Sequence, residues 1–162
     1  MSENTTDSSH ENEGGLEEFV TVTIGDQWFG VPVKSVQDVL GPQKITHIPL
    51  APPEVAGALN LRGRIVTALD MRRRLGLPPQ DEESKSESMS VVVDMGGELY
   101  SLIVDTVGEV LRLSIDDMEK PPATMEEGWR EVCAGIFQLD GKLLLVIDVD
   151  RLLEIRETPI AA

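Results

Sequence analysis

The chain contains two copies of one sequence pattern, and this internal repeat constrains the fold more than any other feature. One set of positions recurs at a constant offset of 78 residues: Gly57 with Gly135, Leu61 with Leu139, Gly63 with Gly141, Arg64 with Lys142, Asp70 with Asp148 and Leu75 with Leu153. A second set recurs at an offset of 71 residues: Phe29 with Tyr100, Val31 with Leu102, Val33 with Val104, Val36 with Val107, Asp38 with Glu109, Val39 with Val110 and Leu40 with Leu111. The repeat predicts two similarly folded units.

The positions of the copies predict how the chain divides. The two offsets differ by seven residues, which are inserted between Leu111 and Ala134. The stretch before the first copy is polar and acidic, so it cannot bury enough apolar surface to offset the entropy of ordering it. The predicted division is, in chain order, a disordered acidic tail at 1–17, a first barrel at 18–79, an acidic serine-rich linker at 80–88, a second barrel at 89–155 and a C-terminal tail at 156–162.

Short strands dominate both copies. Residues 19–24 alternate between apolar and polar side chains, and the alternation resumes from Phe29 to Val33 after a turn. We expect about five such strands per copy, with short helices and no long crossover helix. This pattern predicts an all-β fold of small antiparallel barrels. It leaves open whether residues 19–24 close their own barrel or the neighbouring one.

The turn around Arg62 departs from its copy in an informative way. The second copy has Asp140-Gly141 here, a pair that suits the positive φ values of a tight hairpin, whereas the first has Arg62-Gly63. We therefore expect Arg62 to serve something other than the turn. Five of the fourteen Lys and Arg residues lie in this turn and in the nearby triplet 72–74. The triplet has two interpretations, a solvated helix face or a docking surface.

Composition and charge exclude several classes of protein. The net charge is −15 and only 4% of residues are aromatic, so nucleic-acid binding, which uses basic clusters and stacking rings, is not expected. The longest aliphatic run, 143–147, is too short to span a bilayer, so we expect no membrane insertion. A lone Cys133 fits the reducing cytosol, and we expect it to be a small core residue. These features predict a cytoplasmic protein.

No motif for catalysis, metal binding or cofactor binding is found. His47 precedes a proline that ends a predicted strand, and no Cys pair, HExxH motif or glycine-rich phosphate loop is present. Asp70 and Asp148 occupy equivalent places in the two copies, which favours helix capping over an acid–base pair. We predict a protein that is not an enzyme and carries no cofactor and no metal.

A series of short motifs runs through both copies. They are, in chain order, Phe19-x4-Ile24-Gly25, Phe29-Gly30-Val31, Val36-Gln37-Asp38-Val39, Ile45-Thr46-x-Ile48-Pro49, Asn60-Leu61-Arg62-Gly63, Leu69-Asp70-Met71-Arg72, Ile103-Val104-Asp105 and Ile147-Asp148. Together they closely resemble the CheW family, from Glu18 to Ile155. The Asn-Leu-Arg-Gly turn followed by Asp-x-Arg is the most specific of these signals.

The resemblance implies a pair of SH3-like five-stranded β-barrels acting as a non-enzymatic adaptor. Such adaptors couple the cytoplasmic tips of methyl-accepting chemotaxis receptors to the regulatory domain of the histidine kinase CheA. The resemblance thus implies recruitment to receptor arrays at the membrane. The family positions that bind the receptor are matched here by Val36, Gly57, Arg62 and Val110. Those that bind the kinase are matched by Val33 and Asp38.

Each of these assignments has a structural alternative. Val33, Val36 and Val110 could be core residues, and Gly57 could permit close strand packing, since the second copy retains Gly135. A different class of function, a small-ligand-binding β-barrel regulator, requires a concave apolar pocket with converging polar groups. No sequence pattern indicates such a pocket.

Overall fold

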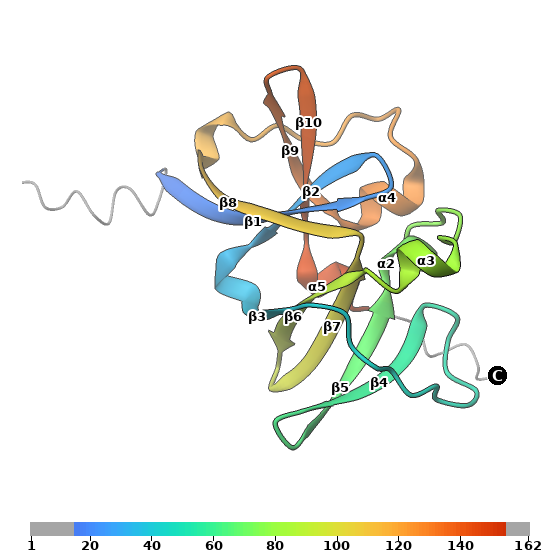
Figure 1. Ribbon diagram of the computed structural model, residues 1–162. Coiled ribbons are helices and arrows are strands. Elements are labelled where there is room, and N and C mark those ends of the chain that lie inside the picture. Colours follow the sequence, from blue (N-terminus) through green and yellow to red (C-terminus); the bar gives the residue numbers. More distant parts are fainter. Residues whose placement is uncertain (1–14, 155–162) are drawn as a thin grey trace, which may run out of the picture.

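Two five-stranded sheets make up most of the molecule, which is a computed structural model describing residues 15–154. Sheet I, in the upper half of Figure 1, has the strand order β8-β1-β2-β10-β9, and sheet II, in the lower half, has the order β3-β6-β7-β5-β4. Sheet I comprises β1 (Leu16–Ile24), β2 (Gln27–Pro32), β8 (Thr106–Ser114), β9 (Cys133–Leu139) and β10 (Lys142–Ile147). Sheet II comprises β3 (Val36–Leu40), β4 (Val55–Leu61), β5 (Arg64–Asp70), β6 (Met89–Met95) and β7 (Glu98–Val104). The predicted all-β fold is confirmed.

The helices are short and lie between strands. They are η1 (Val33–Ser35), α2 (Met71–Arg74), α3 (Glu82–Lys85), η2 (Ile115–Asp117), α4 (Glu127–Val132) and α5 (Val149–Leu152). The carboxylates of Asp70 and Asp148 accept the backbone N–H groups of Arg73 and Arg151, each at 3.2 Å, and cap α2 and α5 as predicted. No helix within residues 15–154 is long and apolar enough to cross a membrane.

Each sheet takes strands from both sequence copies. The first two strands of one copy join the last three strands of the other, so that β1 pairs with β8 and β6 pairs with β3. This arrangement answers the question about residues 19–24: β1 belongs to the sheet that the second copy completes. The prediction of one barrel at 18–79 and another at 89–155 is therefore wrong. Those limits mark sequence repeats, because alternation determines which face a strand buries but not which strand it pairs with.

Strand register supports the internal duplication. In the parallel pair of sheet I, Phe29 on β2 lies opposite Leu145 on β10. In the parallel pair of sheet II, Tyr100 on β7 lies opposite Thr67 on β5. Phe29 and Tyr100 are 71 residues apart and Thr67 and Leu145 are 78 apart, which are the two offsets of the sequence repeat. The two sheets are thus built to one plan from different side chains.

Three apolar clusters hold the molecule together. The largest lies between the sheets, and its members include Val22, Ile24 and Phe29 of sheet I, Val91 and Leu102 of sheet II, and Met71 and Leu152 of the helices. Sheet I has a second cluster around Phe19 and Phe137, and sheet II has a smaller one around Leu59 and Val66. Cys133 belongs to the largest cluster and is 6% exposed, as predicted for a core residue. Burial raises the pKa of its thiol.

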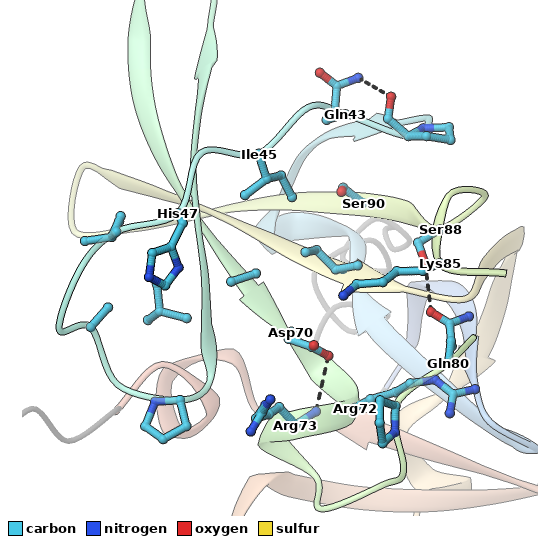
Figure 2. A pocket seen from close by; sticks show the side chains of 18 of the residues that line it. Gln43, Ile45, His47, Asp70, Arg72, Arg73, Gln80, Lys85, Ser88 and Ser90 are labelled. Carbon is cyan, nitrogen blue, oxygen red and sulfur yellow. Dashed lines mark hydrogen bonds between the residues drawn. The ribbon is translucent and has the colours of Figure 1, made fainter. Parts of the chain in front are cut away.

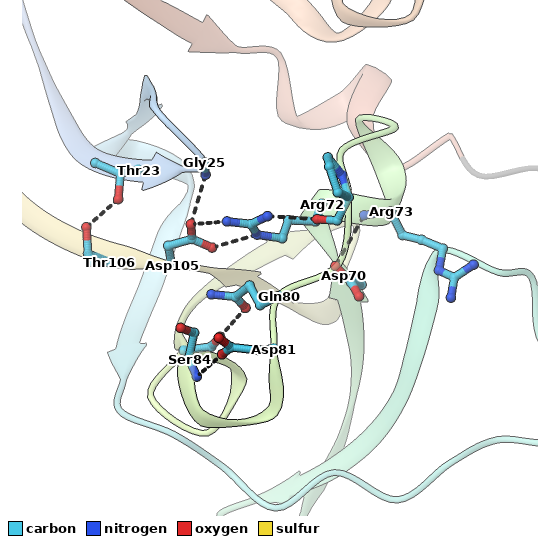
Figure 3. A network of polar contacts seen from close by, with 12 residues as sticks. Thr23, Gly25, Asp70, Arg72, Arg73, Gln80, Asp81, Ser84, Asp105 and Thr106 are labelled. Carbon is cyan, nitrogen blue, oxygen red and sulfur yellow. Dashed lines mark hydrogen bonds and ion pairs between the residues drawn. The ribbon is translucent and has the colours of Figure 1, made fainter.

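A polar clamp joins the two sheets beside this core (Figure 3). The Arg72 guanidinium, at the start of α2, donates two hydrogen bonds to Asp105, at 2.7 and 3.1 Å, and a third to the Pro78 carbonyl. Asp105 also accepts the backbone N–H of Gly25, in the β1–β2 turn of sheet I. The hydrogen bond to Asp105 raises the pKa of Arg72. Bidentate pairing of this kind fixes geometry as well as adding energy.

Candidate docking surfaces on the sheet edges

The six residues predicted to bind partners lie on or beside edge strands. Val36 and Asp38 are on β3 and Gly57 is on β4, the two edges of sheet II, while Val110 is on β8, an edge of sheet I. The other two are Val33, in η1, and Arg62, in the β4–β5 turn. Edge strands expose backbone groups and side chains that inner strands bury, so they are natural places for another protein to bind.

Arg62 and Asp38 form an ion pair. The Arg62 Nη2 atom lies 2.9 Å from Asp38 Oδ2, and the two side chains are 74% and 27% exposed. The family resemblance implies different partners for these two residues, and the structure brings them together. An exposed pair of this kind contributes about 0–1 kcal/mol to stability. Its larger effect is to hold the guanidinium in place while most of its N–H donors still face solvent.

The conformation of the turn confirms that Arg62 is an unusual choice there. Arg62 has φ +53° and Asp140, at the equivalent position, has φ +46°. Both turns therefore adopt the same left-handed conformation, which costs a residue such as arginine roughly 1 kcal/mol. Aspartate tolerates this region better than arginine does. Sequence reasoning found the mismatch, but it could not find Asp38 as the partner because β3 is 24 residues away.

Gly57 has a clear packing role. A Cβ atom placed on it would overlap the Thr46 carbonyl oxygen and would lie 2.7 Å from Ile45 Cγ2, and its φ of +153° disfavours other residues. Thr46 and Ala58 exchange two backbone hydrogen bonds of 2.8 Å at this point. The equivalent Gly135 is less constrained, because a Cβ there would mainly meet the flexible side chain of Met118, with Cγ at 2.6 Å. The alternative explanation for Gly57, that it permits close packing of the strands, is therefore supported. This role does not depend on any interface.

The valines differ in their burial. Val33 and Val36 are half-buried and pack against the large core, which supports their structural alternative. Val110 is 52% exposed and its sequence repeat Val39 is 38% exposed. The register of β3 shifts between Val36 and Asp38, and such a bulge redirects the side chains that follow it.

Further exposed apolar residues were not identified from the sequence. Ile65 on β5 is 71% exposed, close to Arg62 in the chain, and Leu50 is fully exposed in the loop between β3 and β4. Leu143, the sequence repeat of Ile65, is also 40% exposed. The sequence carries no signal of this exposure, because an isolated apolar residue in a strand is common on buried and on exposed faces alike.

The basic triplet is mostly structural. Arg72 forms the clamp with Asp105, and the Arg74 Nε atom donates to the Leu152 carbonyl at 3.1 Å, which ties α2 to α5. Of the three arginines, Arg73 is the exposed one, and its side chain forms no ion pair with another residue of 15–154. Within that same range, no group of three or more His, Cys, Asp or Glu side chains gathers as metal ligands would.

The match to a known family decides what kind of protein this is. The CheW-like domain family matches residues 18–157. The chain belongs to this family. Two of its relatives are a probable chemotaxis protein CheW from Rhizobium etli, 27% identical over 91% of this chain and 94% of the relative, and a chemotaxis protein CheW from Klebsiella aerogenes, 27% identical over 87% and 84%.

A solved structure of the CheW family has the same fold. The scaffolding protein TtCheW from Thermoanaerobacter tengcongensis superposes with a TM-score of 0.78, is 28% identical, and matches over 88% of this chain and 90% of its own. This chain therefore shares its two-sheet fold with a scaffolding protein. The sequence resemblance to the CheW family is confirmed.

Proposed function

We propose that this protein is a non-enzymatic adaptor that couples chemoreceptors to the histidine kinase CheA in chemotaxis-type signalling. The observation that carries the proposal is the match to the CheW-like domain over nearly all of the described fold. Relatives that share the pattern are named chemotaxis proteins, and the matching solved structure is a scaffolding protein. A scaffold needs surfaces rather than a reaction centre, and the exposed apolar residues on the sheet edges supply surfaces.

The receptor side of the proposal consists of Val36, Gly57, Arg62 and Val110. Arg62 supports it best, since its guanidinium is exposed and already oriented by Asp38. A receptor tip is a helical hairpin in this proposal, and helices present carboxylates and carbonyl oxygens that a guanidinium binds. Val110 offers an exposed apolar contact. Val36 and Gly57 act mainly by shaping β3 and β4.

The kinase side consists of Val33 and Asp38, which bind the regulatory domain of CheA. Because Asp38 holds Arg62, the two proposed surfaces meet at one ion pair. A receptor that draws Arg62 away exposes the Asp38 carboxylate to the kinase, and a kinase that engages Asp38 releases Arg62. The proposal thus includes a direct physical link between the two binding events, in a protein that acts in the cytoplasm at membrane-associated receptor arrays.

Reconstitution tests this proposal. The full-length protein is mixed with purified CheA and with receptor signalling fragments, and co-sedimentation and kinase activity are measured. We expect a ternary complex whose formation requires this protein. Binding to neither partner, or kinase activation that is independent of this protein, would contradict the proposal. The charge-swapped variant of the Asp38–Arg62 pair, described in the Discussion, tests the residue assignments separately.

A further inference from the structure

A pocket of about 590 Å³ opens at one end of sheet II (Figure 2). The loop between β3 and β4 forms one wall, and the segment that leads through α3 into β6 forms the other. Ile45, Ala56 and Ile103 supply an apolar part of its lining, next to the small side chain of Ser90. Pockets of roughly 300–1,000 Å³ are the usual size for small-molecule sites.

Sheet I contains the duplicate of this pocket, which serves as an internal comparison. The duplicate has a volume of about 270 Å³ and is lined by Phe19, Pro32, Met118 and Ala134. Strand register shows that these are the same places: Phe19 lies opposite Pro32 in sheet I as Ser90 lies opposite Ile103 in sheet II. The two pockets therefore arose at one position of the repeated fold and now differ by about a factor of two in volume.

The side chains packed inside the two sheets differ in the same direction as the two pocket volumes. In sheet I the rings of Phe19 and Phe137 pack at 5.6 Å and fill the space. Sheet II has Ser90 and Leu59 at these two positions. Two more exchanges go the same way: Val66 replaces Leu144 and Ala68 replaces Val146. Of these four smaller residues, Ser90 lines the sheet II pocket. The other three are buried in the apolar cluster against which Ile45, Ala56 and Ile103 pack.

A buried polar group lies deeper in the same interior. Ser101, on β7, points to the same face as Ile103 two residues later, and it is fully buried. Its hydroxyl is the one buried side-chain oxygen or nitrogen among residues 15–154 that has no hydrogen-bond partner. The equivalent residue in sheet I is Gly30, where a Cβ would approach Leu144 and Phe19 at 3.2 and 3.3 Å. The smaller residues of sheet II admit a hydroxyl that sheet I has no room for.

The charges at the mouths of the two pockets are opposite. The sheet II pocket is lined by Arg73, Lys85 and His47, with one carboxylate, Asp70, that caps α2. Neither Arg73 nor Lys85 forms an ion pair with another described residue. The sheet I pocket is lined instead by Glu17, Asp148, Asp150 and Lys34, and its lysine lies 3.7 Å from Glu17. In a chain of net charge −15, cations without ion-pair partners beside apolar side chains are unexpected, and they favour an anionic ligand with an apolar part.

From these observations we propose that the sheet II pocket binds a small amphiphilic carboxylate. The apolar body of the ligand lies against Ile45, Ala56 and Ile103, inside the sheet. Its carboxylate accepts charge-assisted hydrogen bonds from Lys85 and Arg73 at the mouth. This site is separate from the Asp38–Arg62 pair, so it adds a ligand-binding function to the adaptor and does not depend on partner docking.

Decanoate is the probe that tests the site, with titration calorimetry of the full-length protein as the measurement. We expect saturable binding with a stoichiometry of one, and binding of decan-1-ol, which lacks the carboxylate, at least tenfold weaker. Ser90→Phe introduces the residue that sheet I uses to fill its pocket and should weaken decanoate binding at least tenfold. Circular dichroism checks that this variant is folded.

Lys85→Glu keeps the test decisive if Ser90→Phe fails to fold, because Lys85 is exposed. It should also weaken decanoate binding at least tenfold, while the matched control Lys34→Glu, at the mouth of the sheet I pocket, should leave it unchanged. Absence of saturable binding at millimolar decanoate would overturn the proposal. So would an affinity that Lys85→Glu does not change, or decan-1-ol binding as tight as that of decanoate. All variants should retain CheA binding, so this proposal and the adaptor function can fail independently.

Discussion

Arg62 occupies a backbone conformation that arginine rarely adopts, and its partner Asp38 comes from a strand that meets it only in the folded protein. The residue therefore has two candidate roles, which the structure allows us to separate. In one, it serves only to hold Asp38. In the other, it holds Asp38 and also contacts a receptor.

Arg62→Asp should lower receptor affinity by about 2 kcal/mol, roughly thirtyfold, because it removes charge-assisted donors and adds repulsion. Stability should change by less than about 1 kcal/mol, since the lost ion pair is exposed and aspartate suits the turn. Affinity is measured by titration with a receptor fragment and stability by urea unfolding. Asp140→Arg, the reverse change in the equivalent turn of sheet I, is the matched control and should leave receptor affinity unchanged.

The charge-swapped double variant, Asp38→Arg with Arg62→Asp, decides between the two roles. It restores an ion pair with the opposite polarity. If Arg62 serves only to hold Asp38, receptor binding returns with the swap, and the proposed receptor contact is wrong. We expect binding to remain weak. Kinase affinity should also fall in this variant, because the Asp38 carboxylate that we propose faces CheA has been replaced by a cation.

Cys133 should react slowly with thiol reagents in the native protein. It is buried, its thiol lies 3.2 Å from the Gly135 carbonyl, and burial raises its pKa, so little of the reactive thiolate forms near neutral pH. Labelling at pH 8 should be at least about a hundredfold slower in buffer than in concentrated urea. Because the unfolded thiol ionises at a lower pH than the folded one, this residue favours unfolding only as the pH rises above the ordinary thiol pKa. Equal labelling rates would show that Cys133 is accessible.

At the scale of elements, the residue before β4 that limits Gly57 is Thr46, whose backbone pairs with Ala58 through two hydrogen bonds of 2.8 Å. Gly57→Ala puts a methyl group into the space of the Thr46 carbonyl oxygen, and the residue must keep a positive φ. We expect a loss of about 2–4 kcal/mol in unfolding free energy, measured by urea denaturation. Gly41→Ala, where nothing lies within 4 Å, is the control and should change stability by less than about 0.5 kcal/mol. If Gly57→Ala left the unfolding free energy unchanged, the loop that carries Thr46 would have to move aside at little cost.

Local sequence patterns predicted the elements well, but not how they associate. Alternation at residues 19–24, the glycine-containing turns and the capping carboxylates Asp70 and Asp148 are each determined by a few neighbouring residues, and each was predicted. The pairing of β1 with β8 was not predictable, because it joins residues about ninety positions apart whose side chains would suit several partners. The same limit hid the Asp38–Arg62 pair and the pocket of sheet II.

The site residues came from the family resemblance, and only Arg62 was also singled out by local physics, through the mismatch of its turn with Asp140. Their positions in the fold make some of them better candidates for binding than others. Arg62 and Val110 are exposed, whereas packing inside the protein already accounts for Val33, Val36 and Gly57. Their binding roles stay predictions. The predicted tail at 1–17 is described only from residue 15, and residues 16 and 17 already belong to β1; the rest of that prediction, and residues 156–162, lie outside the described part of the chain.

At the scale of the whole molecule, neither sequence copy should fold by itself. Residues 1–88 carry β1 to β5 but lack the strands that complete both sheets, and residues 89–162 have the complementary deficit. We expect each fragment alone to show no cooperative unfolding transition, and an equimolar mixture to recover one, as measured by circular dichroism during urea titration. The full-length chain cut by a protease within 80–88 after folding is the control and should stay assembled. A fragment that unfolds cooperatively alone would contradict this expectation.

The strand exchange also imposes an order on biosynthesis. A ribosome releases β1 and β2 first, yet sheet I needs β8, β9 and β10, which are the last strands to emerge. All five strands of sheet II lie between these two groups, so sheet II can close while the C-terminal third of the chain is still being translated. The first hairpin therefore waits for its partners, with an apolar face exposed, through most of translation. We therefore expect the hairpin of β1 and β2, rather than the strands β8 to β10, to be the part of the nascent chain that chaperones protect.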